Sequence, residues 1–333
     1  MDHKIDLMLN ELKDILVNSS TFPVAKDLSA KEMREALSDF ESKFRPGRTV
    51  NVTPDFVYSF ISRHGIFNML TKEFHKLGKD ARIIIIEGAD ATGKTELAER
   101  LGGKLGGLAL ENQAVNVFKR MFGLPKIYKT TVVDYNANVL IGLLFYIVVN
   151  TFALEMVFDY LGEGNKYAIL DSSMIRTMAS NITRPAIGGA VGSELLVDEN
   201  VHSLIQNRLN NHVVDMLSKA KANIRMVFLY VTEIARKEQA GGRDFVDAYD
   251  TNTKYAKSIN DFLVQDQALL KRAGVDVLSI LMISGDEIGG KSRGEGGGLA
   301  DVLMVRTPDE MLDIEKKARL VIDHIKGDIA QKK

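Results

Sequence analysis

The spacing of apolar residues changes once along the chain, near residue 81. Before it, apolar residues recur at helical spacing, as in DLMLNELKDILVN near the N-terminus, and Thr53-Pro54 has the residue types that begin helices. From residue 81 the segment ARIIIIEG is short, fully apolar and rich in β-branched residues, which is typical of a buried parallel strand. Similar runs follow at 167–171, 224–231, 275–283 and 301–306, with helical stretches between most of them.

Strands that alternate with helices predict a parallel sheet with right-handed crossovers and helices on its faces. We therefore expect an α/β domain over residues 81–333, preceded by an α-helical N-terminal extension over residues 1–80.

One stretch, VLIGLLFYIVV at residues 139–149, resembles a membrane span. Its uninterrupted apolar run is shorter than the roughly 18–20 residues that a span needs, and Glu155 lies inside any longer window. We expect a buried core helix and no membrane association, and we hypothesise that the helix at 139–158 pairs two copies of the chain in a homodimer.

Composition narrows the function classes. The chain has 333 residues, of which 45% are hydrophobic and 26% charged, with a net charge of -1, so it is globular and lacks a global basic field for nucleic acid. Cysteine is absent, which excludes thiol nucleophiles, cysteine metal ligands and disulfides. The N-terminus has no basic stretch followed by an apolar one, so we expect no secretory signal and a cytoplasmic location.

A local excess of basic residues lies between Lys43 and Lys79. It is interpreted either as a solvated helix face or as a surface that contacts phosphate or nucleic acid.

The strongest signal is a phosphate-binding loop directly after the first predicted strand. It reads Gly88, Ala89, Asp90, Ala91, Thr92, Gly93, Lys94 and Thr95, a complete G-x-x-x-x-G-K-[ST] motif. The glycines let backbone N–H groups curl around phosphate oxygens, and the following helix N-terminus adds partial positive charge. Lys94 is expected to hold the β- and γ-phosphates of ATP, and Thr95 to ligate Mg²⁺.

Asp171 ends the predicted strand YAILD and is the candidate second carboxylate for Mg²⁺, as in a Walker-B strand. The alternative is that Asp171 only caps the following helix. A GTPase would also need an Asn-Lys-x-Asp motif to read the base, and the nearest string, residues 252–255, is Asn-Thr-Lys-Tyr.

Residues 87–95, EGADATGKT, resemble the E-G-x-D-x-x-G-K-[ST] loop of thymidylate kinases and their deoxynucleoside-kinase relatives. The resemblance implies a three-layer P-loop kinase core that transfers phosphate from ATP with Mg²⁺, and it gives Asp90 a place near the acceptor's sugar. Two weaker matches follow in chain order, at 164–180 and 226–250. In the first, Ser172 stands where the family has an arginine that Arg176 would replace. The second implies a lid in which Arg236 and Arg243 clamp the transferring phosphoryl group.

The acceptor side departs from that family. The Arg-Glu-Pro-Gly segment is missing, and the helix pattern at 134–152 has no basic residue. Acceptor charge would come from Lys119, Arg120, Lys126 or Lys129, unless these are simple surface residues. Three hypotheses stay open: a nucleotide or nucleoside kinase, a kinase of hydroxymethylated pyrimidines in DNA, and a non-catalytic ATP-binding module with a protein partner.

The phosphoryl-transfer chemistry also calls for a carboxylate that orients the acceptor. Asp90 is the first candidate for this role and Glu87 the second.

Overall fold

The computed structural model describes ten stretches of the chain: residues 2–18, 24–25, 52–89, 92–122, 131–132, 139–183, 203–241, 253–284, 300–307 and 310–331. The chain forms two compact units, which are described separately. The first unit comprises Met1–Leu70, Asn112–Met156 and Ser180–Asn211, and the second comprises Thr71–Glu111, Val157–Ala179 and His212–Lys333. The domain boundary expected at residue 80 stays a prediction.

The second unit is built on a six-stranded sheet in the order β3-β5-β2-β6-β7-β8, and every neighbouring pair in it is parallel. The strands are β2 (Arg82–Gly88), β3 (Leu108–Leu110), β5 (Tyr167–Asp171), β6 (Ile224–Val231), β7 (Asp276–Ile283) and β8 (Val302–Val305). The α/β fold with a parallel sheet is thus confirmed. Of these six strands, the pattern of apolar residues missed β3, because three residues are too few to show a run.

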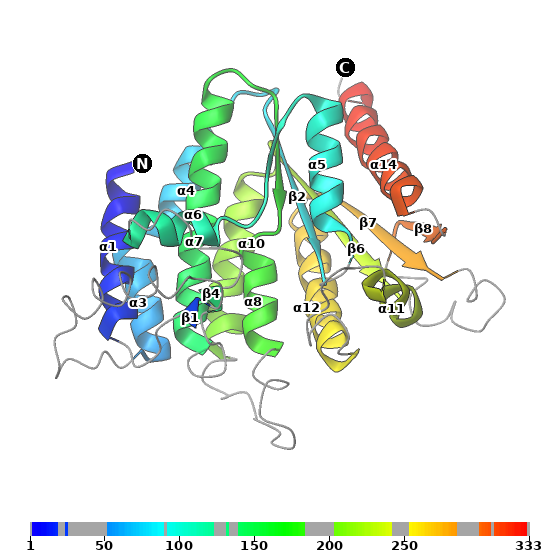
Figure 1. The fold of residues 1–333 in the computed structure, drawn as a ribbon. Helices are drawn as coiled ribbons and strands as arrows, with labels where there is room; N and C mark the ends of the chain where they lie inside the picture. Colours follow the sequence, from blue (N-terminus) through cyan, green and yellow to red (C-terminus); the bar gives the residue numbers. More distant parts are fainter. Residues whose placement is uncertain are drawn as a thin grey trace. The chain divides into compact units, whose positions relative to one another are not determined.

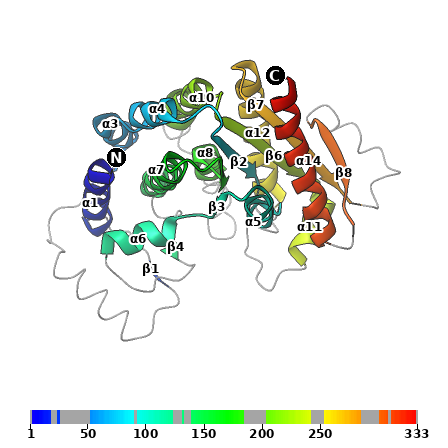
Figure 2. The ribbon, with the colours of Figure 1, turned by 90° about the horizontal axis from the view of Figure 1, so that it is seen from above.

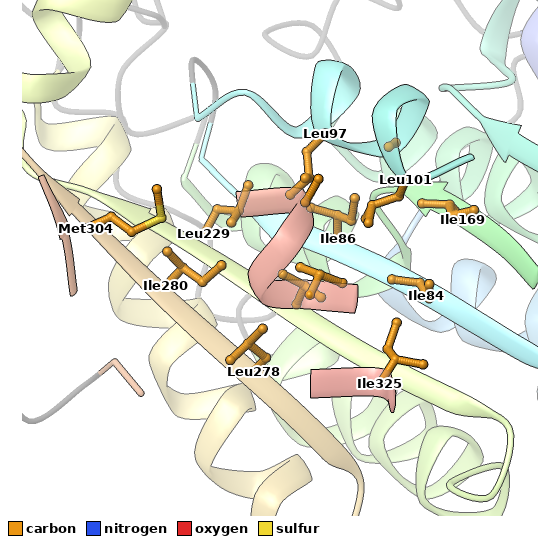
Figure 3. Packing of buried hydrophobic residues seen from close by; sticks show 14 residues of the cluster. Ile84, Ile86, Leu97, Leu101, Ile169, Leu229, Leu278, Ile280, Met304 and Ile325 are labelled. Carbon is orange, nitrogen blue, oxygen red and sulfur yellow. The ribbon is translucent and has the colours of Figure 1, made fainter. Parts of the chain in front are cut away.

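Two helices cover one face of this sheet. Helices α5 (Lys94–Leu105) and α14 (Glu310–Gln331) lie side by side (Figure 2), and Arg100 of α5 pairs with Glu315 of α14 at 2.6 Å. Alternate strand residues, such as Ile84 and Ile86, pack against both helices (Figure 3). The rest of this cluster consists of Leu97, Ala98, Leu101, Ile169, Val227, Leu229, Leu278, Ile280, Met304, Ala318, Val321 and Ile325.

The opposite face is covered by helix α12 (Thr253–Arg272). Tyr230 of β6 donates a hydrogen bond to Gln267 Oε1 of α12 at 2.7 Å, and Gln267 in turn donates to Ser279 Oγ of β7 at 3.2 Å. Because side chains alternate between the two faces of a strand, helices on both faces make this a three-layer α/β arrangement.

The order of the strands fixes where a ligand binds in such a sheet. The chain runs from β2 through α5 to β3 at one edge, returns to β5, and then crosses β2 to continue with β6 and β7 on the other side (Figure 1). Ligands of open α/β sheets bind outside the carboxyl ends of the strands at such a reversal. The end of β2, where the phosphate loop begins, lies at that point.

The described part of the first unit is mainly helical. Its elements include α1 (Asp2–Asn18), α3 (Pro54–His64), α6 (Ala114–Phe122), a π-helical segment η1 (Leu204–Leu209) and the paired two-residue strands β1 (Val24–Ala25) and β4 (Thr131–Val132). Helix α3 begins as expected, since Thr53 accepts a hydrogen bond from Phe56 N at 3.2 Å and Pro54 is the first helical residue. Four helices contribute residues to both units: α4 (Ile66–Lys76), α7 (Val139–Gly162), α8 (Met174–Thr183) and α10 (Asn210–Lys219). Helix α11 (Glu233–Gly241) belongs to the second unit.

Helix α7 contains the apolar stretch that resembles a membrane span. By length and composition its segment Leu140–Gly162 is apolar enough to cross a membrane, and 83% of its most apolar window is buried in the structure. Glu155 on this helix is also buried, with 3% of its surface exposed. Among the described residues, α7 is the single helix that is long and apolar enough to cross a membrane. A buried core helix can have the same length and composition, so α7 is weak evidence for a membrane span.

Candidate functional site

The phosphate loop joins β2 to α5, as the sequence predicts. Gly88 ends the strand where no side chain fits, because an added Cβ would lie 2.8 Å from both the Leu229 carbonyl oxygen and Thr92 Oγ1. Gly93 begins the helix with φ 77° and ψ 32°, a left-handed conformation that favours glycine. Gly88 is therefore explained by the lack of space for a side chain, and Gly93 by its left-handed backbone conformation.

The described loop residues are held by several hydrogen bonds to their carbonyl oxygens. Lys94 Nζ donates to the Ala89 carbonyl at 2.8 Å, and the buried Thr92 hydroxyl donates to the same oxygen at 3.0 Å. Arg176 Nε donates to the Gly88 carbonyl at 2.9 Å, and Lys317 Nζ of α14 donates to the Thr92 carbonyl at 3.2 Å. The Lys94 ammonium thus lies over the loop backbone.

Thr95, the last residue of the motif, is paired with Asp171. Its hydroxyl donates a short hydrogen bond to Asp171 Oδ2. The two residues meet because Asp171 stands opposite Ile86 in the ladder between β2 and β5, so both strands end at the same edge. Asp171 Oδ1 is buried and has no hydrogen-bond partner among the residues described. A hydroxyl next to a carboxylate oxygen without a hydrogen-bond partner is a pair of oxygen ligands that suits Mg²⁺.

Glu87 is the second carboxylate of the site and is fully buried, with 0% of its surface exposed. Its Oε1 accepts a short hydrogen bond from Ser173 Oγ, whereas Oε2 is buried and has no hydrogen-bond partner within the described ranges. Burial raises the pKa of Glu87 from 4.5 to about 7, against the opposing effects of the Ser173 hydrogen bond and the Arg176 and Lys94 charges. The nearby Asp171 carboxylate raises this pKa further. Glu87 is therefore divided between its neutral and charged forms near neutral pH.

The turn after Asp171 has an unusual backbone. Ser172 has φ 100°, which makes it the only residue other than glycine with positive φ in the described ranges. Ser173 follows and accepts a hydrogen bond from Ile175 N at 3.2 Å, so it caps α8 while it donates to Glu87. A non-glycine residue in this region is strained, by about 1–3 kcal/mol. The strained residue therefore lies between Asp171, which contacts Thr95, and Ser173, which contacts Glu87.

The arginines expected to act at the site have different surroundings. Arg176 is 6% exposed and binds the Gly88 carbonyl, so its guanidinium contacts the phosphate loop itself. Arg236 lies in α11, directly after β6, and is buried, with 2% of its surface exposed. Its role as a phosphoryl clamp stays a prediction. Asp90, Ala91 and Arg243 lie outside the described residues.

The basic residues proposed for the acceptor are partly accounted for. Arg120 Nη2 pairs with Asp6 at 2.8 Å, and the Arg120 guanidinium lies 5.5 Å from the centre of the Phe152 ring, so it joins helices of the first unit. Lys119 is exposed, whereas Lys126 and Lys129 lie outside the described residues.

Part of the basic segment 43–79 is paired with acidic side chains. Arg63 pairs with Glu11 at 2.7 Å, and Lys76 pairs with Glu73 at 2.7 Å. Residues 43–51 of the segment lie outside the described residues. A nucleic-acid contact through this segment stays a prediction.

Two contacts of the site were not expected from the sequence, those of Ser173 and Lys317. Lys317 offered a signal, because it follows Ile314 by three residues and precedes Ala318 on the apolar stripe of α14, where a lysine is out of place. Ser173 offered none beyond its place after a strand.

Comparison of the chain with protein-family models and with curated proteins gave no match. The Gly88 close approach, the left-handed Gly93, the Lys94 ammonium and the Thr95–Asp171 pair fit a Mg²⁺-bound nucleoside triphosphate.

Proposed function

We propose that the chain is an ATP-dependent phosphotransferase of the P-loop kinase class that acts on a nucleotide or nucleoside, as thymidylate kinases do. The observation that carries the proposal is the contact between Thr95 and Asp171. These residues are 76 positions apart, yet the sheet brings the motif's hydroxyl to a strand-end carboxylate. A hydroxyl from the first turn of α5 and a carboxylate from the end of β5, both beside a phosphate loop, are oxygen ligands of the kind that Mg²⁺-assisted transfer requires.

Lys94 and Thr95 of the loop and Asp171 at the end of β5 have separate roles in this reaction. Thr95 and Asp171 would hold Mg²⁺, with Asp171 acting directly or through water, and the metal would supply positive charge to the triphosphate. Lys94, which binds the Ala89 carbonyl, is proposed to contact the triphosphate instead when it is bound, together with backbone N–H groups of the loop. Catalysis consists of positioning and charge neutralisation, with Arg236 and Arg243 proposed to clamp the phosphoryl group.

On the acceptor side, Glu87 is suited to take a proton from a hydroxyl. Its pKa of about 7 is close to neutral pH, where a general base is most effective, and Oε2 does not bond to Ser173. With a nucleoside acceptor, the hydroxyl oxygen bonds to the γ-phosphorus, its proton moves to Glu87, and the bond between the γ-phosphorus and the β,γ-bridging oxygen breaks to release ADP. With a nucleotide acceptor, an ionised phosphate oxygen attacks instead and no proton has to be removed. Asp90 is proposed to orient the acceptor's sugar.

The test is transfer of labelled γ-phosphate from ATP in the presence of Mg²⁺. Deoxynucleosides, deoxynucleoside monophosphates and DNA with or without hydroxymethylated pyrimidines serve as acceptors, and Lys94→Ala is the control. Label on a free nucleotide or nucleoside supports the proposal and identifies the acceptor. Label on DNA alone assigns the same chemistry to DNA modification, and binding of ATP without any transfer indicates a non-catalytic module. A cytoplasmic location and a homodimer stay predictions.

A further inference from the structure

Three cationic side chains each bind a different carbonyl oxygen of the phosphate loop. Lys94, within the motif, binds the Ala89 carbonyl. Arg176 of α8 binds the Gly88 carbonyl, and Lys317 of α14 binds the Thr92 carbonyl. Only Lys94 belongs to the motif, so the other two contacts are additions that this chain makes from separate helices.

These contacts determine which way the loop's amide groups point. In a trans peptide the C=O and N–H groups point in opposite directions within one plane. When Lys317 holds the Thr92 carbonyl, the N–H of Gly93 points away from Lys317. When Arg176 holds the Gly88 carbonyl, the N–H of Ala89 points away from Arg176. A phosphate loop needs this arrangement, because its N–H groups bind the anion and its carbonyl oxygens would repel it.

Both cations are buried, although burying a charged group is unfavourable. Lys317 is 2% exposed and Arg176 is 6% exposed. Removing an ammonium or guanidinium from water costs several kcal/mol, so a buried cation is rarely explained by packing alone. Each charge also adds a fixed positive potential next to the loop, where a triphosphate would carry its negative charge.

Helix α14 is firmly attached near Lys317. Glu315 pairs with Arg100 at 2.6 Å and with Lys104 at 2.5 Å, both on α5, the helix that begins at the loop. Four residues before Lys317, the buried Asp313 accepts a hydrogen bond from Thr307 N at 2.8 Å. The helix that carries Lys317 is therefore held to α5 by Glu315 and to the preceding Thr307 backbone by Asp313.

We propose that Lys317 and Arg176 are positioning residues of the nucleotide site, which hold the phosphate loop with its amide groups free to bind the triphosphate. This inference rests on the proposed function. The two residues do not touch the reacting atoms; they act through the Thr92 and Gly88 carbonyls.

The test measures the dissociation constant of a non-hydrolysable ATP analogue with Mg²⁺ by calorimetry, alongside the thermal midpoint of each variant without nucleotide. Lys317→Met and Arg176→Gln remove the charges, and Lys317→Arg keeps a charge and a donor. Arg225→Met is the matched control. Arg225 is also 2% exposed, but it pairs with Asp276 at 2.6 Å at the opposite, amino end of the strands.

We expect Lys317→Met and Arg176→Gln each to weaken analogue binding by about tenfold or more, since a hydrogen bond from a charged group contributes more than a neutral one. Lys317→Arg should restore most of the affinity. Arg225→Met should lower the thermal midpoint without a comparable loss of affinity. If wild-type and both charge-removing variants bind the analogue equally well, the inference is wrong and the proposed function stands. If the wild-type protein binds no analogue, the proposed function fails, and the inference fails with it.

Discussion

Replacing Glu87 with glutamine tests whether burial raises the pKa of the Glu87 carboxyl to about 7. Glutamine has nearly the same shape and keeps an oxygen to accept the Ser173 hydrogen bond. It differs in carrying no titratable proton. Any pH dependence that the substitution removes therefore belongs to the Glu87 carboxyl.

The expected magnitude follows from the pKa. Below pH 4.5 the Glu87 carboxyl is neutral in both the unfolded and the folded protein, and its stabilising proton is fully bound. Between pH 4.5 and about 7 the unfolded chain releases the proton while the folded protein retains it, so stability falls as pH rises. One pH unit corresponds to about 1.4 kcal/mol, so the loss reaches about 3 kcal/mol above pH 7.

The assay is urea unfolding of wild-type, Glu87→Gln and Glu99→Gln proteins at two pH values, about 4.5 and about 8. Glu99 is an exposed residue of α5 and serves as the control. Relative to wild type, Glu87→Gln should gain about 3 kcal/mol in the free energy of unfolding between the acidic and the basic condition. Glu99→Gln should gain much less.

Activity should change in the opposite direction. If Glu87 accepts the proton of a hydroxyl, wild-type phosphoryl transfer rises through pH 7, while Glu87→Gln is slow and loses this dependence. Equal stability differences at both pH values would mean that the buried carboxyl titrates at its ordinary pKa, and the predicted role of burial would be wrong.

Three further predictions concern the loop and the turn beside it. Asp171→Asn should lower phosphoryl transfer by about 10–100-fold, since it removes the charge of a proposed Mg²⁺ ligand, and higher Mg²⁺ concentration should restore part of the activity; unchanged kinetics would contradict the assignment. Gly88→Ala should lower the free energy of unfolding in urea by about 1–3 kcal/mol, because the new Cβ meets a carbonyl oxygen at 2.8 Å. Its control, Gly103→Ala, has open space around it in α5 and should raise the free energy of unfolding by about 0.5–1 kcal/mol. Ser172→Gly should raise the thermal midpoint by relieving the positive φ, and an unchanged or lower midpoint would show that the turn is not strained.

Much of the sheet and the core of the site could be predicted because their signals are local. The isoleucine run of β2 and the spacing of the loop residues lie within fourteen consecutive positions, from Arg82 to Thr95. Such a segment has one reasonable fold, a buried strand followed by a helix. Asp171 was predictable for a related reason, since it ends a second apolar strand and the carboxyl ends of parallel strands share one edge.

The remaining contacts depend on long-range packing that spacing does not encode. Lys317 and Thr92 are 225 positions apart, and Arg120 meets Asp6 across 114 positions. Arg120 was a candidate for acceptor binding because a basic residue can pair with a phosphate as well as with a carboxylate. Its pairing with Asp6 follows only from how α1 and α6 pack. The raised pKa of Glu87 likewise depends on complete burial, which a strand-end glutamate does not reveal.

Phosphoryl transfer by this loop is tested by acceptor-dependent formation of ADP from ATP and Mg²⁺, measured together with label on the acceptor. The wild-type protein should give one labelled acceptor molecule per ADP, and Lys94→Ala should give neither product above background. ADP formed without a labelled acceptor, or transfer that does not depend on Lys94, would contradict the assignment of this loop to phosphoryl transfer.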